Sequence, residues 1–288
     1  MIWHDGLKKD IIGIPLKKVA PQWNSSTPLP EAQLSQLSRM GFDGKFLDYE
    51  KNKELLSMIA GKRLAFVGPS PHLEGMKQGK MIDGYDFIIR VNQNFHTPAY
   101  MVEDYGARTD IGFNCLNVLK INSLLQNMDY VRSLKFMVCP MVSMWDIGKV
   151  NSFLDSTNIP WHNVEDGYLF KIFKDAGTIC NTGLAGIITL LNYDIKELYI
   201  TGMTFYNMGT FGSIYNDKYH DEAFKHGSFK DTRDKQPSVG DLRIDIHQQE
   251  PQIEYFRKIV EKHHGSRMTL DKYLLENFVE KTGEQARK

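Results

Sequence analysis

Short apolar runs alternate with amphipathic patterns along most of the chain. Six runs predict strands, at 63–67, 86–91, 109–113, 135–139, 197–201 and 267–270. Apolar residues at helical spacing predict helices over 31–39, 48–60, 117–126, 149–156, 182–191, 252–263 and 273–280. Continuous apolar runs are typical of parallel strands buried on both faces. Strands that alternate with helices predict an α/β fold with a mainly parallel sheet flanked by helices.

The same pattern divides the chain into three parts. Residues 1–60 are predicted to be an N-terminal extension with short helices, because prolines and serines cluster in its middle. Residues 61–280 are predicted to form a single α/β domain, and residues 281–288 a frayed tail. The chain has 288 residues, of which 42% are hydrophobic, and this is enough for a substantial core.

Charge, hydropathy and cysteine content bear on three properties of the protein: nucleic-acid binding, membrane insertion and cellular location. The 35 Lys and Arg balance the 35 Asp and Glu, whereas a nucleic-acid binder usually has a basic excess. The longest apolar stretch, 184–191, is far shorter than the ~20 residues of a membrane span. We therefore expect no nucleic-acid partner and no transmembrane segment or signal peptide, with peripheral membrane contact left open. Cys115, Cys139 and Cys180 lack metal or redox spacing, which favours reduced thiols and a cytoplasmic location.

Several common site motifs are missing from the sequence. The segment 75–81 has the wrong spacing for a phosphate-binding P-loop, and no Gly-x-Gly-x-x-Gly follows the first predicted strand. His-Glu-x-x-His and Asp-x-Asp are also absent. We therefore expect neither a resident cofactor nor a metal site.

Small and polar residues follow the predicted strands or open a predicted helix, where ligands bind in open parallel sheets. Glycine and serine at a strand end can bring amides and a hydroxyl near a phosphate or ribose. Asparagine amides suit a base or ribose edge, and a helix start suits an anion. Each one alone could be an ordinary turn or cap, but together they predict a nucleotide site. They are Gly68, Ser70, Asn92, Asn94, Asn114, Thr182 and Gly183.

Two long segments resemble the large and small sialyl motifs of the family 29 sialyltransferases. The first joins LAFVGPSPHLEG at 64–75 to IDGYDFIIRVNQN at 82–94, and the second joins NTGLAGIITLL at 181–191 to ELYITGMTFY at 197–206. Between them, GARTD at 106–110 resembles the Gly-x-Arg-Thr-Asp element of the family. The resemblance covers 62–265 discontinuously. It implies a Rossmann-like sheet in a sialyltransferase-type variant of the GT-A fold.

The resemblance also implies roles for individual residues. Asn92 matches the asparagine that contacts the nucleotide of CMP-sialic acid, Ser70 matches the motif serine, and Thr182 with Gly183 matches the pair at the donor phosphate and sugar. Pro69 stands where the family has a donor-binding asparagine, so that contact is lost or supplied elsewhere. The strand at 63–67 has no cysteine for the disulfide of the Golgi enzymes, which fits a bacterial or viral relative.

Two histidines are the candidate catalytic residues. His220, in the sequence YHDE, resembles the third family motif in part, and His247 resembles the histidine of the fourth motif. Gln252 stands where that fourth motif has an acid. An imidazole titrates near neutral pH and suits a general base. We expect His247 to activate the acceptor hydroxyl, and His220 or the helix start at Thr182 to stabilise the leaving phosphate.

The resemblance to the family, with the absence of Asp-x-Asp in agreement, implies an inverting, metal-independent glycosyltransferase. Its donor would be a CMP-sugar that carries a sialic (nonulosonic) acid, and its acceptor a glycan hydroxyl. A transferase for CMP-Kdo is an alternative in the same class. A non-catalytic nucleotide-binding protein is a second alternative, because Pro69 and the imperfect fourth motif depart from the family pattern. The pattern predicts no particular oligomeric state.

Overall fold

The computed structural model describes residues 49–92, 97–116, 118–140, 147–164, 166–205 and 249–280. Seven strands in these residues form one sheet in the order β5-β4-β3-β2-β1-β6-β7. All six pairings are parallel, which confirms the predicted α/β fold. The strands are β1 (Arg63–Val67), β2 (Phe87–Val91), β3 (Ile111–Phe113), β4 (Phe136–Cys139), β5 (Trp161–Asn163), β6 (Glu197–Thr201) and β7 (Met268–Leu270).

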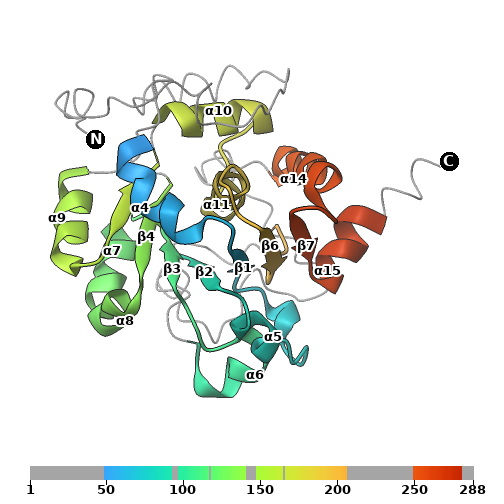
Figure 1. Cartoon of the computed structure of the whole chain (residues 1–288), viewed down its shortest axis with the longest axis horizontal. Helices are drawn as coiled ribbons and strands as arrows, with labels where there is room; N and C mark the ends of the chain where they lie inside the picture. The colour runs from blue at the N-terminus through green and yellow to red at the C-terminus, as the bar shows by residue number, and fades with distance from the viewer. Residues whose placement is uncertain are drawn as a thin grey trace, which may run out of the picture.

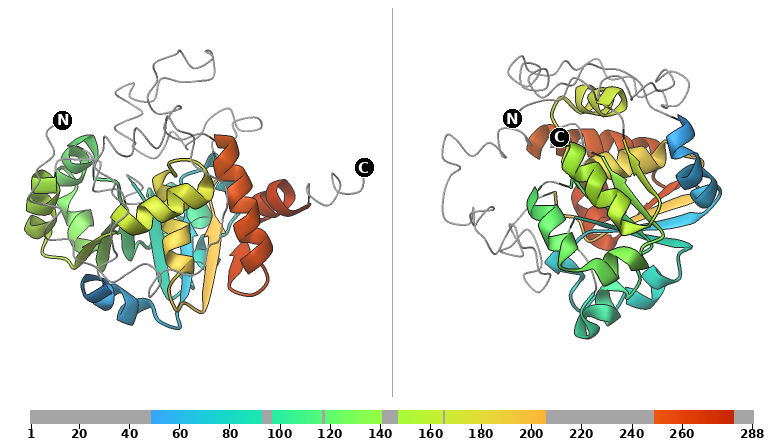
Figure 2. Two further views of the ribbon diagram at one scale, coloured as in Figure 1. Left: turned by 90° about the horizontal axis from the view of Figure 1, so that it is seen from above. Right: turned by 90° about the vertical axis from the view of Figure 1, so that its left-hand side faces the viewer.

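Helices lie on both sides of this sheet (Figure 1, Figure 2). The helices are α4 (Tyr49–Ile59), α5 (Gly79–Asp83), α6 (Val102–Tyr105), α7 (Val118–Leu125), α8 (Met128–Ser133), α9 (Ile147–Thr157), α10 (Asp166–Ala176), α11 (Thr182–Leu191), α14 (Gln249–His263) and α15 (Lys272–Leu275). Short turns of helix are η1 (Pro71–Leu73), η2 (Ala99–Met101) and the π-helical η4 (Glu276–Glu280). None of the helices within the described ranges combines the length and the apolar character that crossing a membrane requires.

Alternate residues of the central strands enter separate cores. In β1, Leu64 and Phe66 belong to the large core with α4, α10, α11 and α14, whereas Ala65 and Val67 face a smaller core with α5 and α6. This alternation follows from the two-residue repeat of a strand. Because both faces are covered by helices, the central strands β1 and β2 are largely apolar, as in most parallel sheets.

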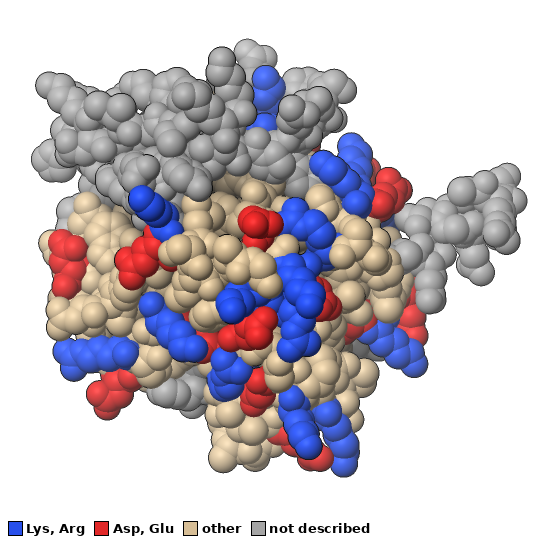
Figure 3. All heavy atoms as spheres, viewed as in Figure 1, with Lys and Arg blue, Asp and Glu red and all other residues tan. Residues whose placement is uncertain are grey.

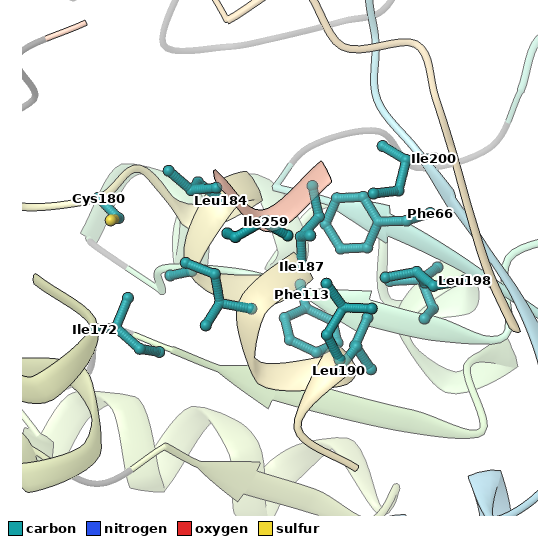
Figure 4. Close-up of a cluster of buried hydrophobic side chains, with 14 of the residues drawn as sticks. Phe66, Phe113, Ile172, Cys180, Leu184, Ile187, Leu190, Leu198, Ile200 and Ile259 are labelled. Carbon is teal, nitrogen blue, oxygen red and sulfur yellow. The ribbon is translucent and has the colours of Figure 1, made fainter. Parts of the chain in front are cut away.

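Helix α11 is the centre of the large core. All ten of its residues are buried, which agrees with a sequence that is apolar on every side. At Gly186, an added Cβ would lie 3.0 Å from Phe113 Cδ1, so the glycine lets the helix lie close to the sheet. Figure 4 shows Leu184, Ile187 and Leu190 clustered with Phe66, Phe113 and Ile259. The position of α11 brings its first turn close to the end of β6, as described below.

Helix α4 connects the predicted extension to the domain. Its Leu55 and Ile59 are fully buried in the large core. The described end of the 1–60 segment therefore packs with the sheet domain. Helix 31–39 and the tail 281–288 lie outside the described residues.

Candidate functional site

The strand order changes direction between β1 and β6. Strands β2 to β5 extend the sheet on one side of β1, and β6 with β7 extends it on the other. In open parallel sheets, ligands bind beyond the carboxyl ends of the strands at such a switch point. The turns that leave β1 and β6 are therefore the first place to look for a site.

These two turns approach each other so closely that both need glycine. Gly68 N donates to Thr201 O at 2.8 Å, and Ser70 N donates to Gly202 O at 2.9 Å. An added Cβ at Gly68 would lie 2.2 Å from Gly202 O, and one at Gly202 would lie 2.3 Å from Gly68 O. Gly202 also has a φ of +72°, which favours glycine. Gly68 thus has a packing role beside the donor contact predicted for it.

Asp271, the first residue after β7, is the centre of a buried polar cluster. Its Oδ2 atom accepts hydrogen bonds from His72 Nε2 at 2.8 Å, Thr201 Oγ1 at 2.7 Å and Gly202 N at 3.2 Å. Its Oδ1 atom accepts from Leu274 N at 2.8 Å and so caps α15. One carboxyl group therefore ties together the ends of three strands.

His72 extends this cluster to the predicted donor-binding serine. Its Nδ1 atom lies 2.9 Å from Ser70 Oγ, and its ring stacks on Tyr273 with centroids 4.6 Å apart. Ser70 is also held through its backbone carbonyl, which accepts a hydrogen bond from the Tyr105 hydroxyl at 2.8 Å. Burial, and then the charge of Asp271, raises the pKa of the Tyr273 hydroxyl. The side chains of Ser70 and His72 are both buried.

Asn92 and Asn114 are adjacent at the ends of β2 and β3. Asn92 has a φ of +54°, a conformation that asparagine tolerates better than most residues. Asn114 Nδ2 donates to Asn92 O at 3.0 Å, and Asn114 Oδ1 accepts from Leu116 N at 2.8 Å. Both the nitrogen and the oxygen of the Asn114 side-chain amide are therefore hydrogen-bonded to the backbone, and they stabilise the turns that follow β2 and β3. Asn92 Oδ1 has one long contact, 3.5 Å from Cys115 N, and no described residue accepts a hydrogen bond from Asn92 Nδ2.

The first turn of α11 lies next to the end of β6. Asn181 is its N-cap, since its side chain accepts from Leu184 N at 2.8 Å. An added Cβ at Gly183 would lie 2.8 Å from the side-chain end of Met203, which follows Gly202. The first N–H groups of a helix have no acceptor within the helix and favour anions. Thr182 and Gly183 lie at a helix start, as predicted. The structure adds that this start is beside the switch point.

Gln252 fastens helix α14 to this same helix start. Its Oε1 atom accepts a hydrogen bond from Asn181 N at 2.9 Å, and the residue is fully buried. In the resemblance to the fourth family motif, Gln252 stands only as the replacement for an acid. In the structure, its amide links α14 to the start of α11 through two residues that are 71 positions apart in sequence.

We expect Gln252→Met to lower the free energy of unfolding by about 1–3 kcal/mol, because it leaves the buried Asn181 N–H without its acceptor. Urea unfolding followed by circular dichroism measures this loss. Gln126→Met, at an exposed position after α7, is the matched control. An unchanged urea midpoint in Gln252→Met would contradict the anchoring role.

The GARTD element, residues 106–110, stabilises the sheet through buried and partly buried hydrogen bonds. Arg108 donates to the carbonyls of Asp83, Tyr85 and Asp86 and to Asp110 Oδ2. Asp110 also accepts from Ile88 N at 2.8 Å. The buried Arg90 of β2 donates to four acceptors in the same segment: Tyr105 O, Gly106 O, Arg108 O and Thr109 Oγ1. The motif thus holds β2 and β3 in place and supports the turn at Asn92.

Three predicted site residues, Asn94, His220 and His247, lie outside the described residues. Conversely, His72 and Asp271 are not among the site residues predicted from the sequence.

The other candidate groups of the described residues show no further site. Cys115, Cys139 and Cys180 are free and buried, and burial raises the pKa of the Cys180 thiol. No three His, Cys, Asp or Glu side chains of the described ranges are grouped as a metal site would require. Acidic and basic side chains are interspersed on the face shown in Figure 3.

Comparison with known proteins gives one family match. Residues 44–165 match the model of glycosyltransferase family 29 (sialyltransferase). This match confirms the resemblance drawn from the sialyl motifs, and it indicates that the chain is a glycosyltransferase. No curated protein matches the chain.

Several solved sialyltransferase structures are also similar to the chain. One is a mammalian sialyltransferase in complex with Gal-beta-1-3GalNAc-ortho-nitrophenol, with 14% identity over 88% of this chain and 93% of that chain and a TM-score of 0.47. Another is CstII from Campylobacter jejuni in complex with the substrate analogue CMP-3FNeuAc, with 18% identity over 76% and 85% of the two chains and a TM-score of 0.45. The same enzyme in complex with cytidine-5'-monophosphate has 20% identity over 76% and 84%, and a TM-score of 0.46.

Proposed function

We propose that this glycosyltransferase moves a sialic acid from a CMP-sugar donor to a glycan hydroxyl, with inversion and without a metal ion. The observation that carries the proposal is the convergence at one sheet edge. The Gly68–Ser70 turn, the Gly202 turn and the start of α11 are in contact at the switch point. Asn92 and Asn114 follow β2 and β3, the first and second strands on one side of β1. The match to the sialyltransferase family supports this choice of donor.

The donor phosphate is assigned to the start of α11. Thr182 and Gly183 supply N–H groups and a hydroxyl there, and the helix dipole favours an anion. CMP carries a single phosphate, so its departure requires less charge compensation than that of a nucleoside diphosphate. Helix N–H groups and His220 supply this compensation in the proposed mechanism.

The nucleotide is assigned to the Asn92 side of the edge. Asn92 Nδ2 has no acceptor among the described residues, while Asn114 holds the Asn92 backbone. An amide that is held in this way can form hydrogen bonds to a base or ribose edge. Gly68 and Ser70 complete the proposed donor side, and Asn94 remains a predicted contact.

His247 is assigned as the general base. It would take the proton of the acceptor hydroxyl while that oxygen forms a bond to the anomeric carbon. The bond from that carbon to the phosphate oxygen breaks on the opposite face, and its electron pair leaves with CMP. His247 precedes α14 by two positions, and α14 is anchored at Gln252 to the proposed phosphate-binding helix start. This anchor supports the assignment.

The proposal includes a cytoplasmic location, which the three free cysteines support. CMP-Kdo is the competing donor for the same chemistry. Turnover of CMP-Kdo in place of CMP-sialic acid would redirect the proposal to that donor. Heat from CMP binding without turnover of either donor would favour a non-catalytic nucleotide-binding protein.

We expect Asn92→Gly to weaken CMP binding about 5- to 150-fold, because an unpaired nucleotide group costs ~1–3 kcal/mol. Glycine removes the amide while tolerating the positive φ of this position. Calorimetric titration with CMP in the presence of EDTA measures the loss, and it also tests metal-free binding by the wild type. Asn158→Gly is the matched control, because Asn158 is exposed and has a similar φ of +58°. Unchanged affinity in Asn92→Gly would overturn this assignment.

A further inference from the structure

A buried chain of hydrogen bonds joins Ser70, His72 and Asp271. The Nδ1 atom of His72 lies 2.9 Å from Ser70 Oγ, and its Nε2 atom lies 2.8 Å from Asp271 Oδ2. The His72 and Asp271 side chains are 4% and 2% exposed. Ser70 and His72 are neighbours in sequence, whereas Asp271 is 199 positions away from His72. The three side chains form one ordered unit at the switch point, and we refer to it as the Ser70 relay.

The donors around Asp271 determine which nitrogen of His72 carries a proton. Backbone N–H groups of Gly202 and Leu274 and the Thr201 hydroxyl all donate to the Asp271 carboxyl group. A carboxylate only accepts hydrogen bonds, so the proton between Asp271 and His72 resides on Nε2. In the neutral imidazole, Nδ1 is then an acceptor, and the Ser70 hydroxyl donates to it.

This direction leaves the Ser70 oxygen as an acceptor. A hydroxyl has one proton and two acceptor positions, and the relay uses the proton. Within the described residues, His72 is the one hydrogen-bond partner of Ser70 Oγ. The Ser70 backbone is separately held by Gly202 O and the Tyr105 hydroxyl. A ligand that meets Ser70 Oγ must therefore present a donor.

We propose that His72 and Asp271 are positioning residues that fix Ser70 Oγ as an acceptor for a ribose hydroxyl of the nucleotide. The inference rests on the proposed function and decides between the two groups, ribose and phosphate, that the β1 turn could contact. A ribose hydroxyl can donate to Ser70, whereas an ionised phosphate presents only acceptors. Phosphate is thereby left to the start of α11.

The test compares the affinities of CMP, 2′-deoxy-CMP and 3′-deoxy-CMP at pH 8 by calorimetry. We expect the wild type to prefer CMP over one deoxy nucleotide by about 5- to 10-fold, the size of a single neutral hydrogen bond. Ser70→Ala, His72→Phe and the double variant should each reduce that preference to about one. The double variant should lose no more than Ser70→Ala, because the two residues act as a unit. Phenylalanine can keep the stacking on Tyr273.

Measurements of stability and of ligand preference together distinguish a role of Ser70 in ribose binding from a role in stability alone. Ser57→Ala, an exposed serine with a local backbone hydrogen bond, is the control and should keep the preference. If Ser70→Ala lowers the melting temperature but keeps the preference for CMP over the deoxy nucleotide, the Ser70 relay contributes only to stability. The inference is then overturned. His72→Gln replaces His72→Phe if the latter does not fold. CMP binding without any ribose preference in the wild type overturns the inference alone, whereas absence of CMP binding overturns the proposed function as well.

Discussion

Replacement of His247 by alanine is expected to lower the rate of sugar transfer by ~10²–10⁴-fold, the usual contribution of a general base. Affinity for CMP should change little, because the base acts on the acceptor hydroxyl and does not need to touch the nucleotide. Steady-state transfer rates and a calorimetric titration with CMP measure the two quantities separately.

The control for this variant is His264→Ala, an exposed histidine after α14, which should transfer at the wild-type rate. His220→Ala should impair transfer through the phosphate and weaken CMP binding. Wild-type rates in His247→Ala with an inactive His220→Ala would mean that the two roles are exchanged. Full activity of both variants would contradict the assignment of His247 and His220 as catalytic residues.

Replacement of Asp271 by alanine is expected to cost about 3–5 kcal/mol of stability, as is usual when one partner of a buried polar pair is removed. Four donors would lose their acceptor: His72 Nε2, Thr201 Oγ1, Gly202 N and Leu274 N. For a domain of this size, the melting temperature should fall by roughly 10 °C.

The matched control is Asp155→Ala, which removes an exposed carboxyl group from α9 and should change stability by less than about 0.5 kcal/mol. Differential scanning calorimetry of both variants measures the difference. A melting temperature of Asp271→Ala within 2 °C of the control, on the order of the change for 1 kcal/mol, would show that the cluster does not hold the three strand ends together.

Local sequence patterns were sufficient for most of the fold. The apolar run at 197–201 became β6, and the helical pattern at 182–191 became α11 with the same bounds. Strand β5 was missed because its three residues, Trp-His-Asn, carry too little apolar pattern. Helix α10 was also missed, although Tyr168, Ile172 and Ala176 recur at helical spacing and are buried, so the signal was present.

The candidate site is predictable only where it follows a strand or opens a helix. Gly68, Ser70 and Thr182 are predicted in this way, and the structure places all three near the switch point. The pairing of His72 with Asp271 carried no local signal, because the two residues become neighbours only when β7 joins β6 at the sheet edge. The role of Gln252 was hidden for the same reason, since its partner lies in a helix that is distant in sequence.

The most direct test of the proposed function is donor turnover by the purified protein. CMP-sialic acid is incubated with glycan acceptors in EDTA, and released CMP and the anomeric configuration of the product are measured. We expect acceptor-dependent release of CMP, one glycan product for each CMP, and an inverted linkage. A protein that binds CMP but releases none from CMP-sialic acid, with any acceptor and with or without divalent metal, would contradict the account.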